Sequence, residues 1–172
     1  MNIIETHHLT KNYGRTRGIV DLNLAVPEGD FFGFIGPNGA GKSTTIRTLL
    51  GLIRPTSGTF KMPDLEDIGY MPSETLFYRG MRVRDVLRLS ADLHGRDCSA
   101  QTAELCQRLD LDPTRRVDDL SLGNRKKVGI VCALQHEPAL YILDEPTSGL
   151  DLLIQREFYR LLQERNERGA TV

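Results

Sequence analysis

The chain has 172 residues, with 22 basic and 23 acidic side chains and a net charge of −1 at pH 7. This length fits one domain with a core of ordinary size and argues against two independent domains. The balanced charge predicts no broad contact with nucleic acid, and the longest apolar stretches, 31–35 and 138–143, are much shorter than the roughly 20 residues that cross a bilayer.

The first third of the sequence predicts strands joined by turns. Apolar residues alternate in "NIIETHHL" and "IVDLNLAV", and a turn at "PEGD" precedes a third predicted strand, "FFGFIG". The period then changes to that of a helix in "KSTTIRTLL", which Gly51 ends, and "RPTSG" has the composition of a loop. A further short strand is predicted at "DIGYM".

The rest of the chain predicts a helical segment followed by the other half of a mixed core. From Val83 to Ala133 the pattern is helical, with one apolar stripe at Val83, Val86 and Leu87. A second stripe includes Ala103, Cys106 and either Leu105 or Leu109. An apolar strand "ALYIL", a helix over 152–168 ended by Gly169, and the first residues of another strand in "ATV" complete the sequence.

These elements predict one domain in three parts. Residues 1–72 hold a β subdomain and the first half of an α/β core, 73–133 form a helical subdomain, and 134–172 form the second half of the core.

The cysteines and histidines show no spacing typical of a disulfide framework or a metal site. They are Cys98, Cys106, Cys132, His7, His8, His94 and His136. We expect reduced cysteines that pack in the interior, surface or hydrogen-bonded histidines, and no metal ion held by histidine. Because the N-terminus has no signal-peptide pattern, we expect a soluble, cytosolic chain.

The strongest motif is "GPNGAGKS", which lies between a predicted strand and a predicted helix, as a phosphate-binding loop requires. Small residues let the backbone wrap around a phosphate chain, the helix N-terminus favours negative charge, Lys42 adds a point charge, and the Ser43 hydroxyl suits Mg²⁺. The predicted nucleotide-binding residues of this loop are Gly36, Pro37, Asn38, Gly39, Ala40, Gly41, Lys42, Ser43 and Thr44.

Two adjacent carboxylates end the strand "LYIL". Asp144 is a candidate Mg²⁺ ligand, directly or through water, and Glu145 is a candidate general base for the water that attacks the terminal phosphate. Neighbouring side chains on a strand point apart, so one acid can face the metal and the other the water. The pair alone is weak evidence, since strand ends are often solvated. It gains force from the phosphate loop about 100 residues earlier.

With "GPNGAGKST", "LSLGN" and "ILDEPTSGLD" in this order, nearly the whole chain resembles the ATP-binding subunit of ABC transporters. The resemblance implies a RecA-like P-loop α/β core with an antiparallel β subdomain and a helical subdomain. It also implies an ATPase that uses ATP and Mg²⁺, with ATP bound between two subunits placed head to tail.

The resemblance assigns further residues. Tyr13 matches an aromatic residue that stacks on adenine, although it could also be a buried tyrosine of the β subdomain. Ser121, Gly123 and Asn124 match the signature that reaches the partner's γ-phosphate, and the same serine can cap a helix. Leu122 and Asn124 depart from the common glycine and glutamine. The last group matches a loop through which the two subunits contact each other: Ser148, Gly149 and Asp151.

Where the family usually has a glutamine after the strand "IGYM", this chain has Ser73, which is too short to reach as far. Glu74 could reach, but its charge would interact with Mg²⁺ and repel phosphate. We expect a contact mediated by water at this position, which we call the Q-loop position. The segment "YMPSETLFY" resembles the corresponding sequence of bacterial ABC-2-type exporters, including peptide-antibiotic and drug resistance systems.

A second departure concerns the end of the sequence. The family has a switch histidine after the strand that follows the 152–168 helix, and no histidine follows Asp151 here. That strand belongs between the phosphate-loop strand and "LYIL", so its absence predicts unpaired backbone in the middle of the sheet. A shortened loop in the β subdomain is also expected from "SGTFKMPDLEDIGY". We therefore expect a C-terminally truncated domain with negligible turnover.

The leading hypothesis is an ATP-hydrolysing subunit that drives export through a separate membrane permease, at the inner face of the cell membrane. One alternative is a soluble ABC-type ATPase acting on ribosomes or DNA, which usually carries two cassettes or long coiled insertions. The other is a catalytically deficient nucleotide-binding fragment.

Overall fold

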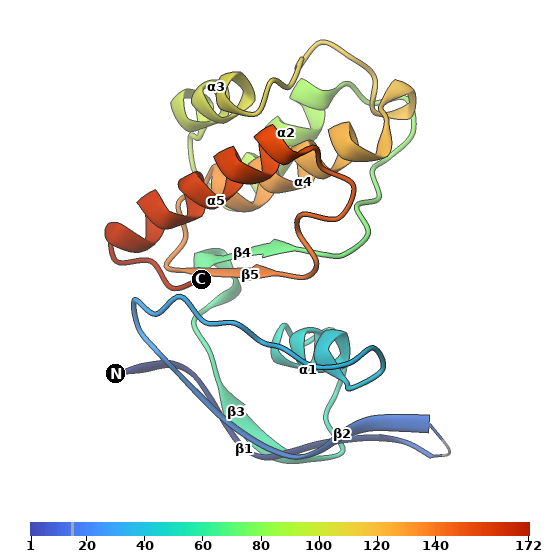
Figure 1. Ribbon diagram of the computed structural model, residues 1–172, viewed down its shortest axis with the longest axis vertical. Coiled ribbons are helices and arrows are strands. Elements are labelled where there is room, and N and C mark those ends of the chain that lie inside the picture. Colours follow the sequence, from blue (N-terminus) through green and yellow to red (C-terminus); the bar gives the residue numbers. More distant parts are fainter. Residues whose placement is uncertain (15) are drawn as a thin grey trace.

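Two sheets organise the chain, which the computed structural model describes over residues 1–14 and 16–172 (Figure 1). The first is antiparallel, in the order β2-β1-β3, and consists of β1 (Asn2–Tyr13), β2 (Thr16–Pro27) and β3 (Ser57–Lys61). The strands predicted at "NIIETHHL" and "IVDLNLAV" are confirmed as parts of β1 and β2. Their alternating apolar side chains include Ile4, Leu9 and Val26, which are buried.

The strand β3 was not predicted, because "RPTSG" has the composition of a loop. Only its first part is a loop, and β3 begins at Ser57. A Cβ built on Gly58 would lie 2.4 Å from the carbonyl oxygen of His8 on the neighbouring strand, so the glycine allows β3 to approach β1. The close pairing of β3 with β1 therefore makes this segment a strand, although it begins with residues typical of a loop.

The second sheet is parallel and consists of β4 (Ile68–Met71) and β5 (Leu140–Leu143), both predicted correctly. The register sets Met71 beside Leu143, so the two strands end at the same edge. All the helices between residues 83 and 134 are therefore a crossover between neighbouring parallel strands.

Residues 31–35 are not the strand that the sequence predicts. Their backbone meets Val172, which donates to Asp30 O and accepts from Phe32 N at 2.9 and 2.7 Å. Thr171 pairs on its other side with β5, as an isolated bridge to Leu140. Within the described residues no strand pairs with 33–36, and Ile35 is 93% exposed. The apolar run 31–35 lacks the neighbouring strand that a regular strand needs. The start of a strand predicted in "ATV" is present as an isolated bridge at Thr171, between β5 and the segment 30–32.

The helices are α1 (Lys42–Leu49), α2 (Val83–Leu93), α3 (Ser99–Arg108), α4 (Leu122–Leu134) and α5 (Leu152–Glu167). Two short 3₁₀ helices, Leu65–Asp67 and Val117–Asp119, lie in the connections. The predicted helical segment and the 152–168 helix are confirmed, with their ends shifted by one or two residues. The α2 stripe is buried as predicted. On α3 both Leu105 and Leu109 are buried with Cys106, whereas Ala103 is exposed.

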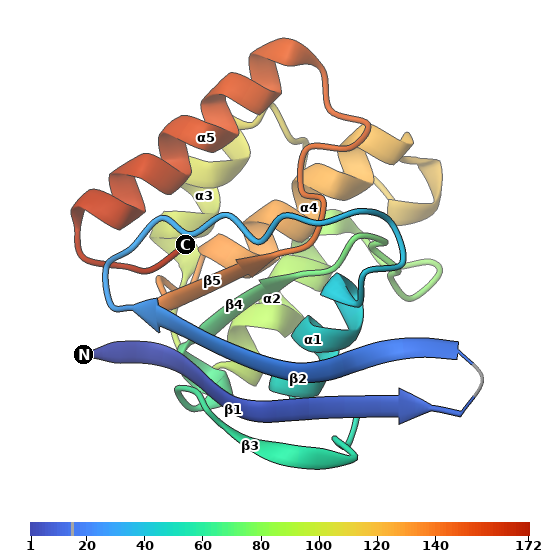
Figure 2. The same ribbon diagram turned by 60° about the horizontal axis from the view of Figure 1, so that its bottom comes forward.

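Two cores cover the two faces of the parallel sheet. One lies among α2, α3, α4 and α5 and includes Leu134 and Phe158, which are fully buried. The other lies between the sheet, α1 and the antiparallel strands, and includes Leu49, Ile68 and Ile142 (Figure 2). Strands buried on both faces are typical of parallel sheets. This sandwich fixes where the carboxyl ends of β4 and β5 lie.

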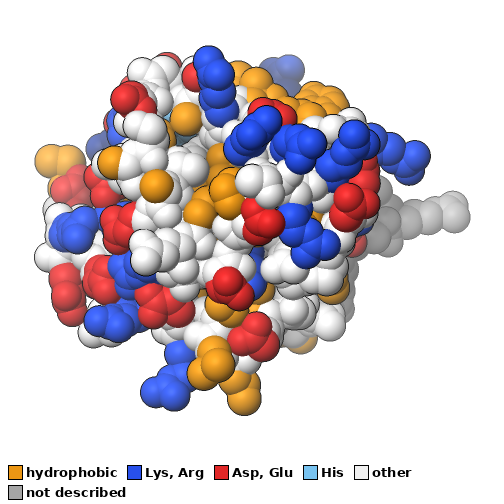
Figure 3. All heavy atoms as spheres, turned by 90° about the horizontal axis from the view of Figure 1, so that it is seen from above, with side chains coloured by type: hydrophobic (Ala, Val, Ile, Leu, Met, Phe, Trp, Pro, Cys, Tyr) orange, Lys and Arg blue, Asp and Glu red, His pale blue; other side chains and the backbone are white. Residues whose placement is uncertain are grey.

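The outer face of the helices carries acidic and basic side chains interspersed with apolar ones (Figure 3). An ionic cluster links α3 to α5: Arg108 contacts Glu157 at 2.6 Å, Glu164 at 2.7 Å and Glu104 at 3.3 Å. The first two carboxylates lie on α5, so this cluster fixes the outer helix against the helical subdomain.

The three cysteines carry free thiols, and Cys98 and Cys106 are buried, as expected of packing residues. His136 agrees in part with the prediction of a surface or hydrogen-bonded histidine, because within the described residues one of its two ring nitrogens has a partner. It is 3% exposed, its ring stacks on that of His94 with centroids 3.7 Å apart, and its Nδ1 has no partner although Nε2 contacts Ile68 O. Burial lowers the pKa of His136 to about 4, and the His94 charge adds to this effect.

Across residues 1–14 and 16–172, the helices all lack the length and the apolar character that a bilayer crossing needs.

Candidate functional site

The phosphate loop (residues 36–43) joins the irregular segment after β2 to the start of α1. Gly41 is the N-cap of α1 and has φ 95°, a left-handed conformation that favours glycine. A Cβ there would lie 2.9 Å from Gly18 O on β2. A glycine is therefore needed for both the turn and the close packing, and the N-terminus of α1 opens toward the loop.

The ammonium of Lys42 lies over the mouth of this loop. Its Nζ donates to the carbonyl oxygens of Gly36 at 2.6 Å and Pro37 at 3.0 Å. The loop thus closes around its own positive charge, at the place where the motif puts a phosphate group.

Ser43 and Asp144 meet although 101 positions separate them. Ser43 Oγ donates to Asp144 Oδ2 at 2.9 Å, and Asp144 is 6% exposed. The amide of Asp144 donates to Met71 O at 2.9 Å, which continues the ladder between β5 and β4 and fixes the carboxylate in place. Two hard oxygen donors at hydrogen-bond distance fit a Mg²⁺ ion. The two predicted metal ligands therefore lie together, while metal binding itself stays a prediction.

Glu145 lies one residue beyond, on the exposed side of the strand end. Its backbone has φ 48°, a left-handed conformation that is rare for a residue with a side chain. Asp144 is buried and Glu145 is exposed, but Glu145 lies beyond β5 in a left-handed conformation, so the alternation of an extended strand does not apply to it. The role of Glu145 as general base stays a prediction.

The Q-loop position is held through its backbone. Ser73 O accepts a hydrogen bond of 2.6 Å from Lys126 Nζ, and the side chain of Glu74 is exposed. The same ammonium donates to Glu145 O at 3.1 Å. Sequence reasoning missed Lys126. The available signal was the run "RKK" on a helix whose third and fourth turns are apolar, which put a charge where the core had to be.

The signature (residues 120–124) begins α4. Ser121 is its N-cap, and Ser121 Oγ accepts from the amide of Asn124 at 3.3 Å, so the predicted capping role is present. A Cβ on Gly123 would lie 2.9 Å from Gly149 O. The signature therefore packs directly against the dimer loop (residues 148–151), in which Ser148 is exposed and Asp151 caps α5 by accepting from Ile154 N at 3.0 Å.

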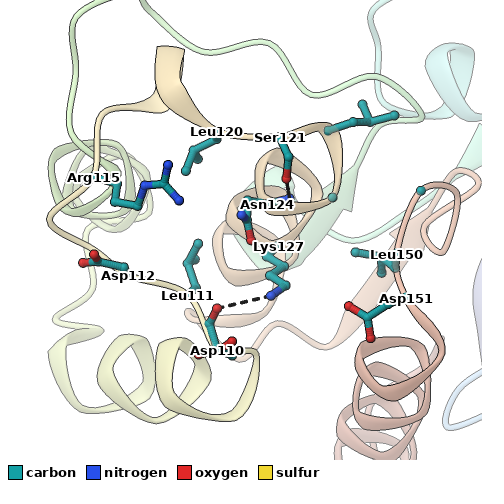
Figure 4. A pocket seen from close by; sticks show the side chains of 13 residues that line it. Asp110, Leu111, Asp112, Arg115, Leu120, Ser121, Asn124, Lys127, Leu150 and Asp151 are labelled. Carbon is teal, nitrogen blue, oxygen red and sulfur yellow. Dashed lines mark hydrogen bonds between the residues drawn. The ribbon is translucent and has the colours of Figure 1, made fainter.

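A pocket of about 700 Å³ lies where these two segments meet (Figure 4). Ser121 and Asp151 face it from the starts of α4 and α5, and Lys127 Nζ donates across its wall to Asp110 O at 3.2 Å. Arg115 lines the opposite side. Among the described residues that line this pocket, none belongs to the phosphate loop of the same chain. The signature and the phosphate loop therefore lie on separate surfaces of the described chain.

Tyr13 lies at the end of β1 and is 44% exposed. The alternative of a buried tyrosine is therefore wrong. Lys11 Nζ lies 5.2 Å from the centre of its ring, a cation–π contact that holds the ring at the surface. Its stacking on adenine stays a prediction.

A glycine-rich turn that opens a helix, a lysine in the turn and a serine paired with an acidic strand end define a P-loop nucleotide-binding protein. The chain also has a helix start capped by Ser121 that packs against residues 148–151.

The chain belongs to the ABC transporter family, whose model matches residues 19–148. It is 39% identical to the bacitracin transport ATP-binding protein BcrA of Bacillus licheniformis, over 99% of this chain and 60% of that protein. It is 35% identical to the probable multidrug ABC transporter ATP-binding protein YbhF of Escherichia coli, over 99% of this chain and 32% of that protein. The chain thus spans between a third and three fifths of these relatives.

Among solved structures, an ATP-binding subunit of an ABC transporter superimposes with a TM-score of 0.89 at 30% identity, covering 98% of this chain and 76% of that chain. The predicted fold class, an α/β ABC ATPase core with an antiparallel sheet and helices, is confirmed, and so is the resemblance to this family.

Proposed function

We propose that this chain is the ATP-hydrolysing subunit of an exporter, and that it binds Mg²⁺-ATP at the phosphate loop. The observation that carries the proposal is the 2.9 Å contact between Ser43 Oγ and Asp144 Oδ2, beside a loop closed around Lys42. A fold alone does not define a reaction, but this contact brings together the two groups that a nucleotide-bound Mg²⁺ requires.

Each residue has one task in this proposal. The amides of residues 39–43 and the Lys42 ammonium hold the phosphates, after Lys42 exchanges the carbonyls of Gly36 and Pro37 for phosphate oxygens. Ser43 and Asp144 hold Mg²⁺, which when bound neutralises charge on the terminal phosphates. Glu145 accepts the proton of the attacking water, for which its exposed position beside the site is suitable.

The second subunit and the permease are further parts of the proposal. The signature pocket is a separate half-site that would meet the phosphate loop of a second, head-to-tail subunit. The names of BcrA and YbhF, a bacitracin and a probable multidrug transport protein, support a role in transport. Export through a separate permease at the inner face of the membrane is part of the proposal.

The test of nucleotide binding is Lys42→Ala, with Lys61→Ala as control, because Lys61 is an exposed lysine on β3. Loss of a charged donor to phosphate is expected to weaken Mg²⁺-ATP binding at least about 30-fold in calorimetry, with no change for the control. Equal affinities in the two variants contradict the phosphate-loop assignment.

The test of hydrolysis is Glu145→Gln, with Glu66→Gln as control on an exposed 3₁₀ helix. Removing a general base is expected to lower kcat by about 10²–10⁴-fold while ATP binding persists. If Glu145→Gln keeps the kcat of the unsubstituted chain, Glu145 is not the general base. Co-purification with ribosomes in place of a membrane permease would favour the soluble alternative.

A further inference from the structure

Lys126 is a buried cation that lies between the two strand ends of the candidate site. The residue is 2% exposed and comes from the second turn of α4. Its ammonium donates to Ser73 O, just after β4, and to Glu145 O, just after β5. One side chain therefore joins the signature helix to the Q-loop position and to the candidate general base.

The acceptors are backbone carbonyls, which distinguishes this contact from an ion pair. Asp144 and Glu145 are the acidic groups that act on the ammonium, and their charges favour its protonated form, whereas burial lowers the pKa of Lys126. A buried ammonium needs acceptors for its protons, and here the two carbonyls supply them. The hydrogen bonds thus fix the directions of two peptide groups.

One of those peptide groups belongs to Glu145, which is among the five described non-glycine residues with positive φ. Glu145 has φ 48°, and such conformations persist in residues with side chains only when the surroundings hold them. The carbonyl of that residue accepts from Lys126 at 3.1 Å. The direction of the Cα–Cβ bond of Glu145 follows from its backbone conformation, so a group that holds the backbone also sets where the side chain starts.

We propose that Lys126 is a positioning residue that holds Glu145 in its left-handed conformation and couples this conformation to Ser73 and to α4. Since α4 begins at Ser121, the helix that faces the second half-site also carries the group that orients the candidate base. Lys126 acts through Glu145 and has no contact with the reacting atoms. The kinetic part of this inference rests on the proposed ATPase function, and its structural part does not.

The test compares Lys126→Met, which keeps an unbranched chain but removes the ammonium and its donors, with Lys126→Arg, which restores a charged donor. In Lys126→Met we expect kcat to fall at least about 30-fold, the Kd for Mg²⁺-ATP to change less than about threefold, and amide exchange over 145–149 to accelerate at least about tenfold. Exchange in 140–143 should stay unchanged. Lys126→Arg should recover at least about a third of kcat.

The inference is overturned if Lys126→Met has the kcat and the amide exchange of the unsubstituted chain. It is also overturned if Lys126→Met and Lys126→Arg lose kcat equally and both lose ATP binding, because that result indicates a purely structural effect. If the unsubstituted chain does not hydrolyse ATP, in line with the negligible turnover expected from the sequence, the exchange comparison decides the inference alone, and Mg²⁺-ATP binding tests the proposed function separately. If Lys126→Met does not fold, lysine-selective ¹⁵N NMR of the unsubstituted chain decides. A slowly exchanging Lys126 ammonium signal supports the inference, and its absence where the signal of Lys127 is visible overturns it.

Discussion

Substituting Gly123 by alanine tests the contact between the signature and the dimer loop. On helix propensity alone the change should stabilise α4 by up to about 1 kcal/mol. The structure opposes this, because the new Cβ would lie 2.9 Å from Gly149 O, a backbone atom that cannot rotate away. Displacing a packed backbone segment costs typically about 1–3 kcal/mol. We therefore expect a net loss of about 1–2 kcal/mol.

Gly129 on the same helix is the matched control. A Cβ there would lie 2.5 Å from Thr75 Cγ2, which is an even closer contact, but this atom ends a side chain that can change its rotamer. A rotamer adjustment costs about 0.5–1.5 kcal/mol, which the gain in propensity offsets. Gly129→Ala should therefore be close to neutral, although distance alone ranks it as the worse substitution.

Thermal unfolding measures both variants. For a chain of this size 1 kcal/mol corresponds to about 2–4 °C, so Gly123→Ala should lower Tm by about 2–8 °C and Gly129→Ala should change it by less than about 2 °C. ATP binding to the phosphate loop should be retained in Gly123→Ala, while ATP-dependent dimerisation of a Glu145→Gln background should be weakened. A Gly123→Ala protein at least as stable as the parent refutes the reasoning.

Three further expectations follow from the buried and paired groups. The pKa of His136 is about 4 in the folded chain and 6.5 in the unfolded chain, so the unfolded state binds more protons between these two pH values. The free energy of unfolding should therefore fall by up to about 3 kcal/mol from pH 6.5 to below pH 4. Urea unfolding at each pH measures this loss, which should be smaller in His136→Phe. Arg108→Met leaves Glu157 and Glu164 without their shared partner and should cost about 1–3 kcal/mol, whereas Arg88→Met, at an exposed pair with Asp92, should cost less than about 1 kcal/mol. Burial raises the pKa of the Cys132 thiol to about 12, so its reaction with a thiol reagent at pH 8 should be slow until the chain unfolds.

Sequence reasoning predicted most elements because their signals are local. The phosphate loop needs glycine in a left-handed turn and a helix directly after it, and both are visible in "GPNGAGKS". Parallel pairing of β4 and β5 could not be deduced from periodicity, and neither could the 2.9 Å contact between Ser43 and Asp144. That contact was predicted only through the roles of the two residues.

The incorrect predictions share a physical cause, since each depends on a neighbour distant in the sequence. "FFGFIG" has the composition of a strand, but a strand is defined by its partners, and within residues 1–14 and 16–172 the backbone of 30–32 bonds to Val172 without forming a ladder. "RPTSG" has the composition of a loop, but β1 recruits its end into the sheet. His136 and Lys126 have no apolar pattern of their own, and they are buried because the elements beside them pack together.

The position of Lys126 suggests how a serine can stand where the family usually has a glutamine. The resemblance implies a glutamine that reaches from the strand end toward the nucleotide, and the side chain of Ser73 is too short for such a contact. In this chain the connection runs in the opposite direction: Lys126 reaches from α4 to the backbone of Ser73 and also to that of Glu145. A backbone carbonyl is present whatever the side chain, so this link places no demand on the residue at position 73. It does demand a long donor at position 126, and Lys126→Met should therefore be more damaging than Ser73→Ala.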